Sequence, residues 1–223
     1  MIRRISAALV LVLSIASPAL AVDGNPAPQP SNAFPFVGRV RQESFQADVN
    51  LCTSSLIRAS VALSAAHCIN TSDLTQGFND EQHFERFRFA TGSSYFALGV
   101  RHPNFNPATS ANDIALVLVL NGPSAPLGTL IAAADPVAVG DSVQFLGFAR
   151  VNDDGQPLLG MSSVSRIGAL DYGYNGMPHF IEPGDSGGPA LKNFGTPANP
   201  NWKIISAGDL SGTIIGGNVI QLP

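Results

Sequence analysis

The sequence has little charge, little sulfur and no excess of basic residues. Charged side chains make up 13% of its 223 residues, and 12 Lys or Arg stand against 16 Asp or Glu, for a net charge of −4. Neither a nucleic acid nor an anionic membrane surface is therefore an expected partner. The two cysteines come without further cysteines or a histidine pair, so we expect no structural zinc site.

Long apolar runs are also absent after residue 21. Residues 1–21 combine Arg3 and Arg4, an apolar run over 8–15 and the small-residue pattern Ala19-Leu20-Ala21, which is typical of a secretory signal peptide cleaved after Ala21. The run is too short to span a bilayer comfortably. We expect a secreted protein, extracellular or periplasmic, without stable membrane association after removal of the leader.

Glycine and proline are abundant, with 22 and 17 copies. Short apolar stretches separated by turns, without helical periodicity, predict an all-β barrel or sandwich. A Gly/Pro/Ser break at 121–126 marks the expected link between two halves. The stretches expected to form strands are 36–40, 51–57, 61–63, 87–91 and 114–120, then 137–139, 143–148, 158–167, 190–191, 204–207 and 213–222.

One stretch carries a candidate nucleophile. Residues 182–189 read Glu-Pro-Gly-Asp-Ser-Gly-Gly-Pro and place Ser186 among glycines. A serine hydroxyl attacks a carbonyl effectively when a base takes its proton and backbone N–H groups receive the resulting negative charge. By itself this composition is equally typical of a tight turn between strands.

Two distant segments decide between these interpretations. Residues 63–68 read Leu-Ser-Ala-Ala-His-Cys, and residues 112–116 read Asn-Asp-Ile-Ala-Leu. With the serine stretch, in this order, the chain resembles the trypsin/chymotrypsin-like serine proteases. The resemblance extends to segments 34–37, 101–106 and 147–149. Glu182-Pro183 and the short span between Asp113 and Ser186 are similar to bacterial secreted members.

The resemblance implies a fold and a domain division. The fold is all-β, with two antiparallel six-stranded β-barrels and the active site in the cleft between them. Residues 22–122 would form the barrel that carries His67 and Asp113, and 123–223 the barrel that carries Ser186. Cys52 and Cys68 have the spacing of the family's disulfide beside the histidine, which also fits an oxidising compartment.

The implied chemistry is peptide-bond hydrolysis without a cofactor or a metal. Ser186 would attack the carbonyl, His67 would move its proton, and Asp113 would hold the imidazole in the required tautomer. The N–H groups of Gly184 and Ser186 would form the oxyanion hole, since Pro183 has no N–H. We expect a protein or peptide substrate and a monomeric enzyme.

Two other functions are considered. The pattern Gly184-x-Ser186-x-Gly188 also fits the elbow of α/β-hydrolases, but these take their residues in the order Ser, Asp, His, and no histidine follows Ser186. That fold is excluded. A catalytically inactive, protease-like binding protein stays open, because sequence does not show whether the oxyanion hole assembles.

Asp185 is expected to have a structural role. In trypsin-type relatives the aspartate before the serine pairs with a new apolar N-terminus, here Val22 after leader cleavage. Some bacterial relatives use an internal arginine instead, for which Arg150 and Arg166 are candidates. Both possibilities are kept, because an ion pair of either kind would stabilise a buried carboxylate.

The resemblance also gives an expected substrate pocket. Phe180, followed by Ile181, would lie at its base, where an arginine head group would be buried without a counter-ion. The opposite wall would be Ser206, Ala207 and Gly208, an extended edge able to pair with the substrate backbone. We expect cleavage after apolar residues, unless Glu182 or Asp209 turns inward.

Overall fold

The computed structural model describes residues 34–44, 47–69, 84–89, 94–122, 126–148, 157–168, 172–175 and 184–207. These residues form eleven β-strands and one short 3₁₀ helix, which confirms the all-β prediction. No helix among them is long and apolar enough to cross a membrane.

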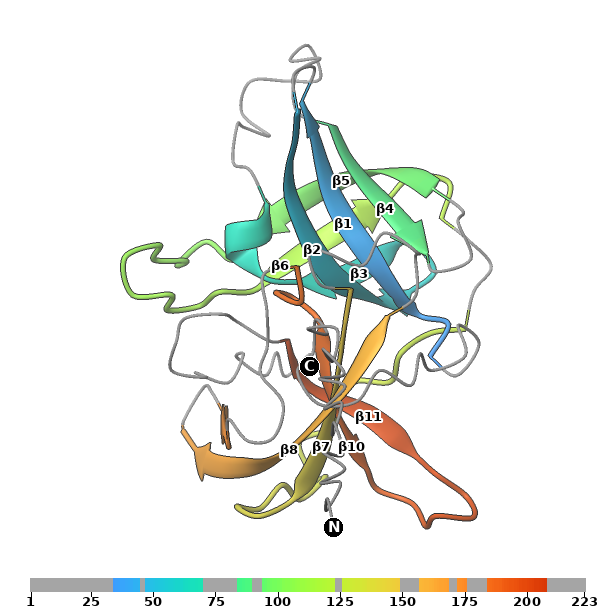
Figure 1. The fold of residues 1–223 in the computed structure, drawn as a ribbon, viewed down its shortest axis with the longest axis vertical. Helices are drawn as coiled ribbons and strands as arrows, with labels where there is room; N and C mark the ends of the chain where they lie inside the picture. Colours follow the sequence, from blue (N-terminus) through green and yellow to red (C-terminus); the bar gives the residue numbers. More distant parts are fainter. Residues whose placement is uncertain are drawn as a thin grey trace, which may run out of the picture.

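The first half is a closed antiparallel barrel of six strands in the order β1-β2-β3-β6-β5-β4, as expected. It occupies the upper part of the view in Figure 1. Its strands are β1 (Val37–Ser44), β2 (Ala47–Arg58), β3 (Val61–Ser64), β4 (Phe84–Phe89), β5 (Ser94–Arg101) and β6 (Ala115–Val119).

Strand β6 shows how the sequence directs side chains into this barrel. Ala115, Val117 and Val119 are buried, whereas Leu116 and Leu118 are 38% and 42% exposed. Successive side chains of a strand point to opposite faces, so a strand that is apolar throughout places leucines on both sides. The outer face of this barrel is consequently apolar at β6.

The second half is a five-stranded sheet in the order β11-β10-β7-β8-β9. All of its pairings are antiparallel. A sixth strand closing it into a barrel is not found among the described residues. Segment 129–131 does pair with β11, through the N–H of Ile204 bonded to Thr129 O and the N–H of Ile131 bonded to Ile204 O. The strands are β7 (Ser142–Gly147), β8 (Leu158–Ile167), β9 (Tyr172–Tyr174), β10 (Pro189–Asn193) and β11 (Trp202–Ala207).

The two halves share one hydrophobic core. Its largest cluster joins first-barrel side chains such as Leu56 and Val117 to Leu146, Phe148 and Ile204 of the second half. Burial of these side chains stabilises the contact between the halves by roughly 1.5–3 kcal/mol for each large one. The second half also has a smaller cluster of its own around Phe145 and Tyr174.

The strand predictions from sequence were correct for most elements and wrong for some. Strand β8 has the expected bounds, but β5 and β9 were missed. Because β5 carries exposed Phe96 and Val100 beside buried Ala97, it lacks the alternation that marks a half-buried strand. Residues 137–139 are not a strand: the Ala138 N–H bonds Asp141 Oδ2 in a turn. The predicted strand at 213–222 lies outside the described residues.

Two ion pairs brace the surface of the second half. Lys203 Nζ lies 2.7 Å from Asp135 Oδ2, and Lys192 contacts Asp141. The hydrogen bond from Lys203 lowers the pKa of Asp135 below its ordinary value of 3.8. Burial pushes the pKa of Asp141 upward, but hydrogen bonds from Lys192 and the Ala138 N–H outweigh it, and its pKa is also lowered.

We predict that Asp141 adds its full stability above its unfolded pKa and loses it in acid. A depressed folded pKa contributes stability that is complete above about pH 4 and lost as pH falls through the folded pKa. Asp141→Asn should therefore destabilise the protein at pH 7, and its difference from the wild type should shrink towards pH 2. Urea unfolding midpoints across this range test it, and a difference independent of pH would contradict it.

Candidate active site

His67 lies in the 3₁₀ helix η1 (Ala66–Cys68), directly after β3. The predicted disulfide is present: Cys68 is bonded to Cys52 of β2, with 6.1 Å between the Cα atoms. The carbonyl of the next residue, Ile69, accepts a hydrogen bond from the guanidinium of Arg101 at the end of β5. The short helix is thus held to the barrel on both sides.

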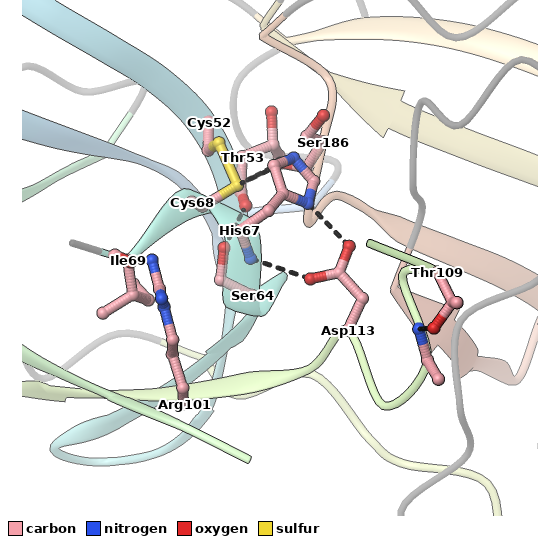
Figure 2. Close-up of polar contacts among 11 residues, drawn as sticks. Cys52, Thr53, Ser64, His67, Cys68, Ile69, Arg101, Thr109, Asp113 and Ser186 are labelled. Atoms are coloured by element: carbon pink, nitrogen blue, oxygen red, sulfur yellow. Dashed lines mark hydrogen bonds and ion pairs between the residues drawn. A yellow bond between two sulfur atoms is a disulfide. The ribbon is translucent and has the colours of Figure 1, made fainter. Parts of the chain in front are cut away.

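Asp113 lies in the loop between β5 and β6 and is 6% exposed. Its carboxylate accepts two hydrogen bonds from His67, one from the backbone N–H to Oδ1 at 2.8 Å and one from Nδ1 to Oδ2 at 2.6 Å, as Figure 2 shows. The residue before it, Asn112, has a φ of 56° and donates its side-chain N–H to Asn104 O. Asparagine tolerates this left-handed conformation better than most residues.

The bond to Asp113 determines which ring nitrogen of His67 is available. Because the carboxylate accepts from Nδ1, the neutral imidazole carries its proton there, and its basic lone pair is on Nε2. Nε2 lies 3.7 Å from Cys68 Sγ, and the same sulfur lies 3.7 Å from the carbonyl oxygen of Ser186. The imidazole and the backbone of the serine therefore both lie next to this sulfur atom (Figure 2).

Ser186 lies in a buried turn, residues 184–187, which leads into β10. Gly184 and Gly187 have φ values of 105° and 80°, a region that residues with a side chain seldom adopt. Asp185 and Ser186 are 5% and 3% exposed. The Ser186 carbonyl accepts a hydrogen bond from the Thr53 N–H of β2 at 2.8 Å. The turn thus belongs to the second half of the chain but is anchored to the first barrel.

Only part of the expected substrate pocket lies among the described residues. Ser206 and Ala207 lie at the end of β11 and are nearly buried. Phe180, Ile181, Glu182, Gly208 and Asp209 lie outside the described residues.

A residue that the sequence did not indicate, Tyr174, is hydrogen-bonded through its hydroxyl to Ser206 Oγ. Its ring meets Phe145 edge-on at 4.8 Å. Burial raises the pKa of Tyr174, more than the Ser206 hydrogen bond lowers it, so the phenol stays neutral. The one feature of the sequence that could have indicated a strand here is the short Tyr-Gly-Tyr alternation of residues 172–174.

One group of side chains has the spacing of metal ligands. The ligand atoms of Cys52, His67 and Cys68 lie within 4.8 Å of one another. Both sulfurs belong to the disulfide, and metals bind the thiolate form of cysteine. This group therefore does not fit a metal ion.

Comparison with known proteins places these residues in a family. The family model described as Trypsin matches residues 22–216. Serine protease 57 of Mus musculus is 35% identical over 122 residues, 51% of this chain and 42% of that protein. Serine protease 57 of Rattus norvegicus is 32% identical over 142 residues, which are 60% of this chain and 49% of that protein. Neutrophil elastase of Mus musculus is 30% identical over 148 residues, which are 63% of this chain and 51% of that protein. The chain matches about half the length of these relatives.

We predict that Gly187→Ala is much more destabilising than Gly140→Ala. Both glycines have positive φ values, 80° and 93°, so the backbone strain is similar. A Cβ at Gly187 would lie 2.3 Å from Ser64 Oγ and 2.5 Å from Thr53 O, whereas one at Gly140 meets nothing within 4 Å. The clash should cost about 1–3 kcal/mol more unfolding free energy, measurable in urea. Equal losses would show that the turn is not packed against β2 and β3.

Proposed function

The chain belongs to the trypsin family, and on this basis we propose that it is a secreted serine endopeptidase acting through Ser186, His67 and Asp113. The observation that carries the proposal is the 2.6 Å contact between His67 Nδ1 and Asp113 Oδ2, made where a buried serine turn meets the first barrel. A neutral imidazole held in this way is the base that a serine nucleophile needs.

In the proposed reaction, Ser186 Oγ attacks the substrate carbonyl and its proton passes to His67 Nε2. Asp113 stabilises the imidazolium that forms. The tetrahedral intermediate then collapses, the C–N bond breaks, and His67 returns the proton to the leaving amine. Water attacks the acyl-enzyme by the same route in reverse, which releases the acid and regenerates Ser186.

The negative charge on the carbonyl oxygen would be bound by the N–H groups of Gly184 and Ser186. The positive φ at Gly184 and the burial of the turn support this assignment, because such donors act through a fixed, water-excluded geometry. One such donor contributes roughly 3 kcal/mol to transition-state stabilisation.

Asp185 would stabilise the geometry of this turn through its buried carboxylate. Its carboxylate is buried against Gly147: a Cβ built there would lie 2.0 Å from Asp185 Oδ1. A buried carboxylate is costly unless it is paired. Val22 and Arg150 lie outside the described residues, and Arg166 is exposed on β8. These three groups are the candidates for the cation that pairs with Asp185.

A second candidate is a protease-like binding protein without catalysis. His67 Nε2 lies 3.7 Å from Cys68 Sγ, and hydrolysis requires this nitrogen to accept the proton of Ser186 Oγ. Secretion is supported by the disulfide, which is typical of oxidising compartments.

We predict that a fluorophosphonate labels Ser186 in the folded protein. Ser186→Ala and His67→Ala should each abolish labelling and peptide hydrolysis, and the double variant should be hardly worse, because the residues act as a unit. Hydrolysis should also fall in acid as His67 gains a proton. Absence of labelling in the folded wild type would favour the binding protein.

We predict cleavage after apolar residues. Phe180 at the expected pocket base offers no negative charge to a basic side chain, so burial of Lys or Arg would carry a large desolvation cost. A peptide library read by mass spectrometry measures the preference, with Asp209→Asn as the control. A strong preference for Lys or Arg that this substitution removes would reassign the pocket to Asp209.

A further inference from the structure

Thr53 of β2 is fully buried and bonds to the second half of the chain at three points. Its N–H donates to Ser186 O at 2.8 Å. Its hydroxyl donates to Gly184 O at 2.8 Å and accepts the Phe148 N–H at 3.1 Å. One side chain of the first barrel therefore links the serine turn to the segment that follows β7.

These bonds involve both residues proposed to form the oxyanion hole. The hydroxyl of Thr53 holds the carbonyl of Gly184, and its N–H holds the carbonyl of Ser186. A peptide unit is planar, so each carbonyl is fixed together with the N–H of the next residue: Gly184 O with the Asp185 N–H, and Ser186 O with the Gly187 N–H. The unit that carries the Ser186 N–H lies between these two, and its own carbonyl, that of Asp185, accepts a hydrogen bond from the Gly188 N–H at 2.9 Å. The donor N–H groups of Gly184 and Ser186 are therefore each one Cα atom away from a peptide unit that Thr53 holds.

The surroundings leave Thr53 little freedom. Its carbonyl accepts a hydrogen bond from Ser64 Oγ at 2.9 Å. Phe148, which donates to the hydroxyl, is fully buried, and the guanidinium of Arg39 lies 4.7 Å from the centre of its ring. Arg39 is in turn paired with Thr53 across β1 and β2. The hydroxyl is therefore held between two fixed partners.

We propose that Thr53 is a positioning residue, whose hydroxyl holds the serine turn in the geometry that lets Gly184 and Ser186 bind the oxyanion. The proposal rests on the proposed function. Thr53 touches no reacting atom and acts only through the turn. A preorganised oxyanion site loses effect when its donors are displaced or free to move, so losing the hydroxyl should reduce kcat and leave substrate binding largely intact.

The test compares Thr53→Val with Thr53→Ser. Valine keeps the shape of the side chain but removes the hydroxyl, so the Gly184 carbonyl and the Phe148 N–H each lose their hydrogen bond to it. Serine keeps the hydroxyl. We expect Thr53→Val to lower kcat on a chromogenic peptide, and the rate of fluorophosphonate labelling, at least about tenfold. KM should change less than about threefold, and Thr53→Ser should stay within about threefold of wild-type kcat.

Ser54→Ala is the matched control. Ser54 is also fully buried on β2, but its hydroxyl donates to Gly38 O inside the first barrel at 3.3 Å. This variant should lose stability in urea yet keep the wild-type kcat and labelling rate. If Thr53→Val does not fold, Thr53→Ala and Thr53→Ser form the pair, since they differ only by the hydroxyl.

The outcomes separate the two hypotheses. Wild-type kcat in folded Thr53→Val, with only a lower unfolding midpoint, would overturn the positioning role and leave the proposed function standing. A folded wild type that is neither labelled nor active would overturn the proposed function and, with it, the role of Thr53.

Discussion

The structure depends on the contact between strand β2 and the turn that carries Ser186. His67 and Asp113 come from the first barrel and Ser186 from the second half, so their relative placement is set by the residues that join the halves. Two neighbours on β2 make contacts that place these residues, one within the first half and one across to the second. Cys52 is bonded to the helix of His67, and Thr53 is bonded to the serine turn. A single strand therefore positions the histidine and the serine together.

The site also concentrates features that are unfavourable elsewhere in a protein. Asn112 has a positive φ value, and Asp113 and Asp185 bury carboxylates. Such features persist only where the surroundings compensate for them. For Asp113 the compensation comes from the two hydrogen bonds of His67. The shared core beneath, including Leu146 and Phe148, provides the stability that tolerates this local cost.

Much of the fold could be predicted because the informative segments are local. The stretches around His67, Asp113 and Ser186 each carry a short motif, and β8 has clear turn boundaries. Other features depend on contacts far apart in the chain. The hydroxyl of Thr53 gains its partners from residues 148 and 184, and nothing in the residues beside it indicates this. Strand β9 is only three residues long, too short for a period to be visible.

The single disulfide has a consequence for how the protein is made. With two cysteines there is one possible intramolecular pairing, so oxidative folding has no mispaired isomer to escape and needs no reshuffling step. The bond also joins two residues that are 16 positions apart and closes a loop that ends beside the imidazole. Reduction would remove this tie on the helix of His67 and leave the hydrogen bond from Arg101 to Ile69 O on its other side. For the proposed protease, this covalent constraint beside the imidazole therefore forms only where an oxidant is present.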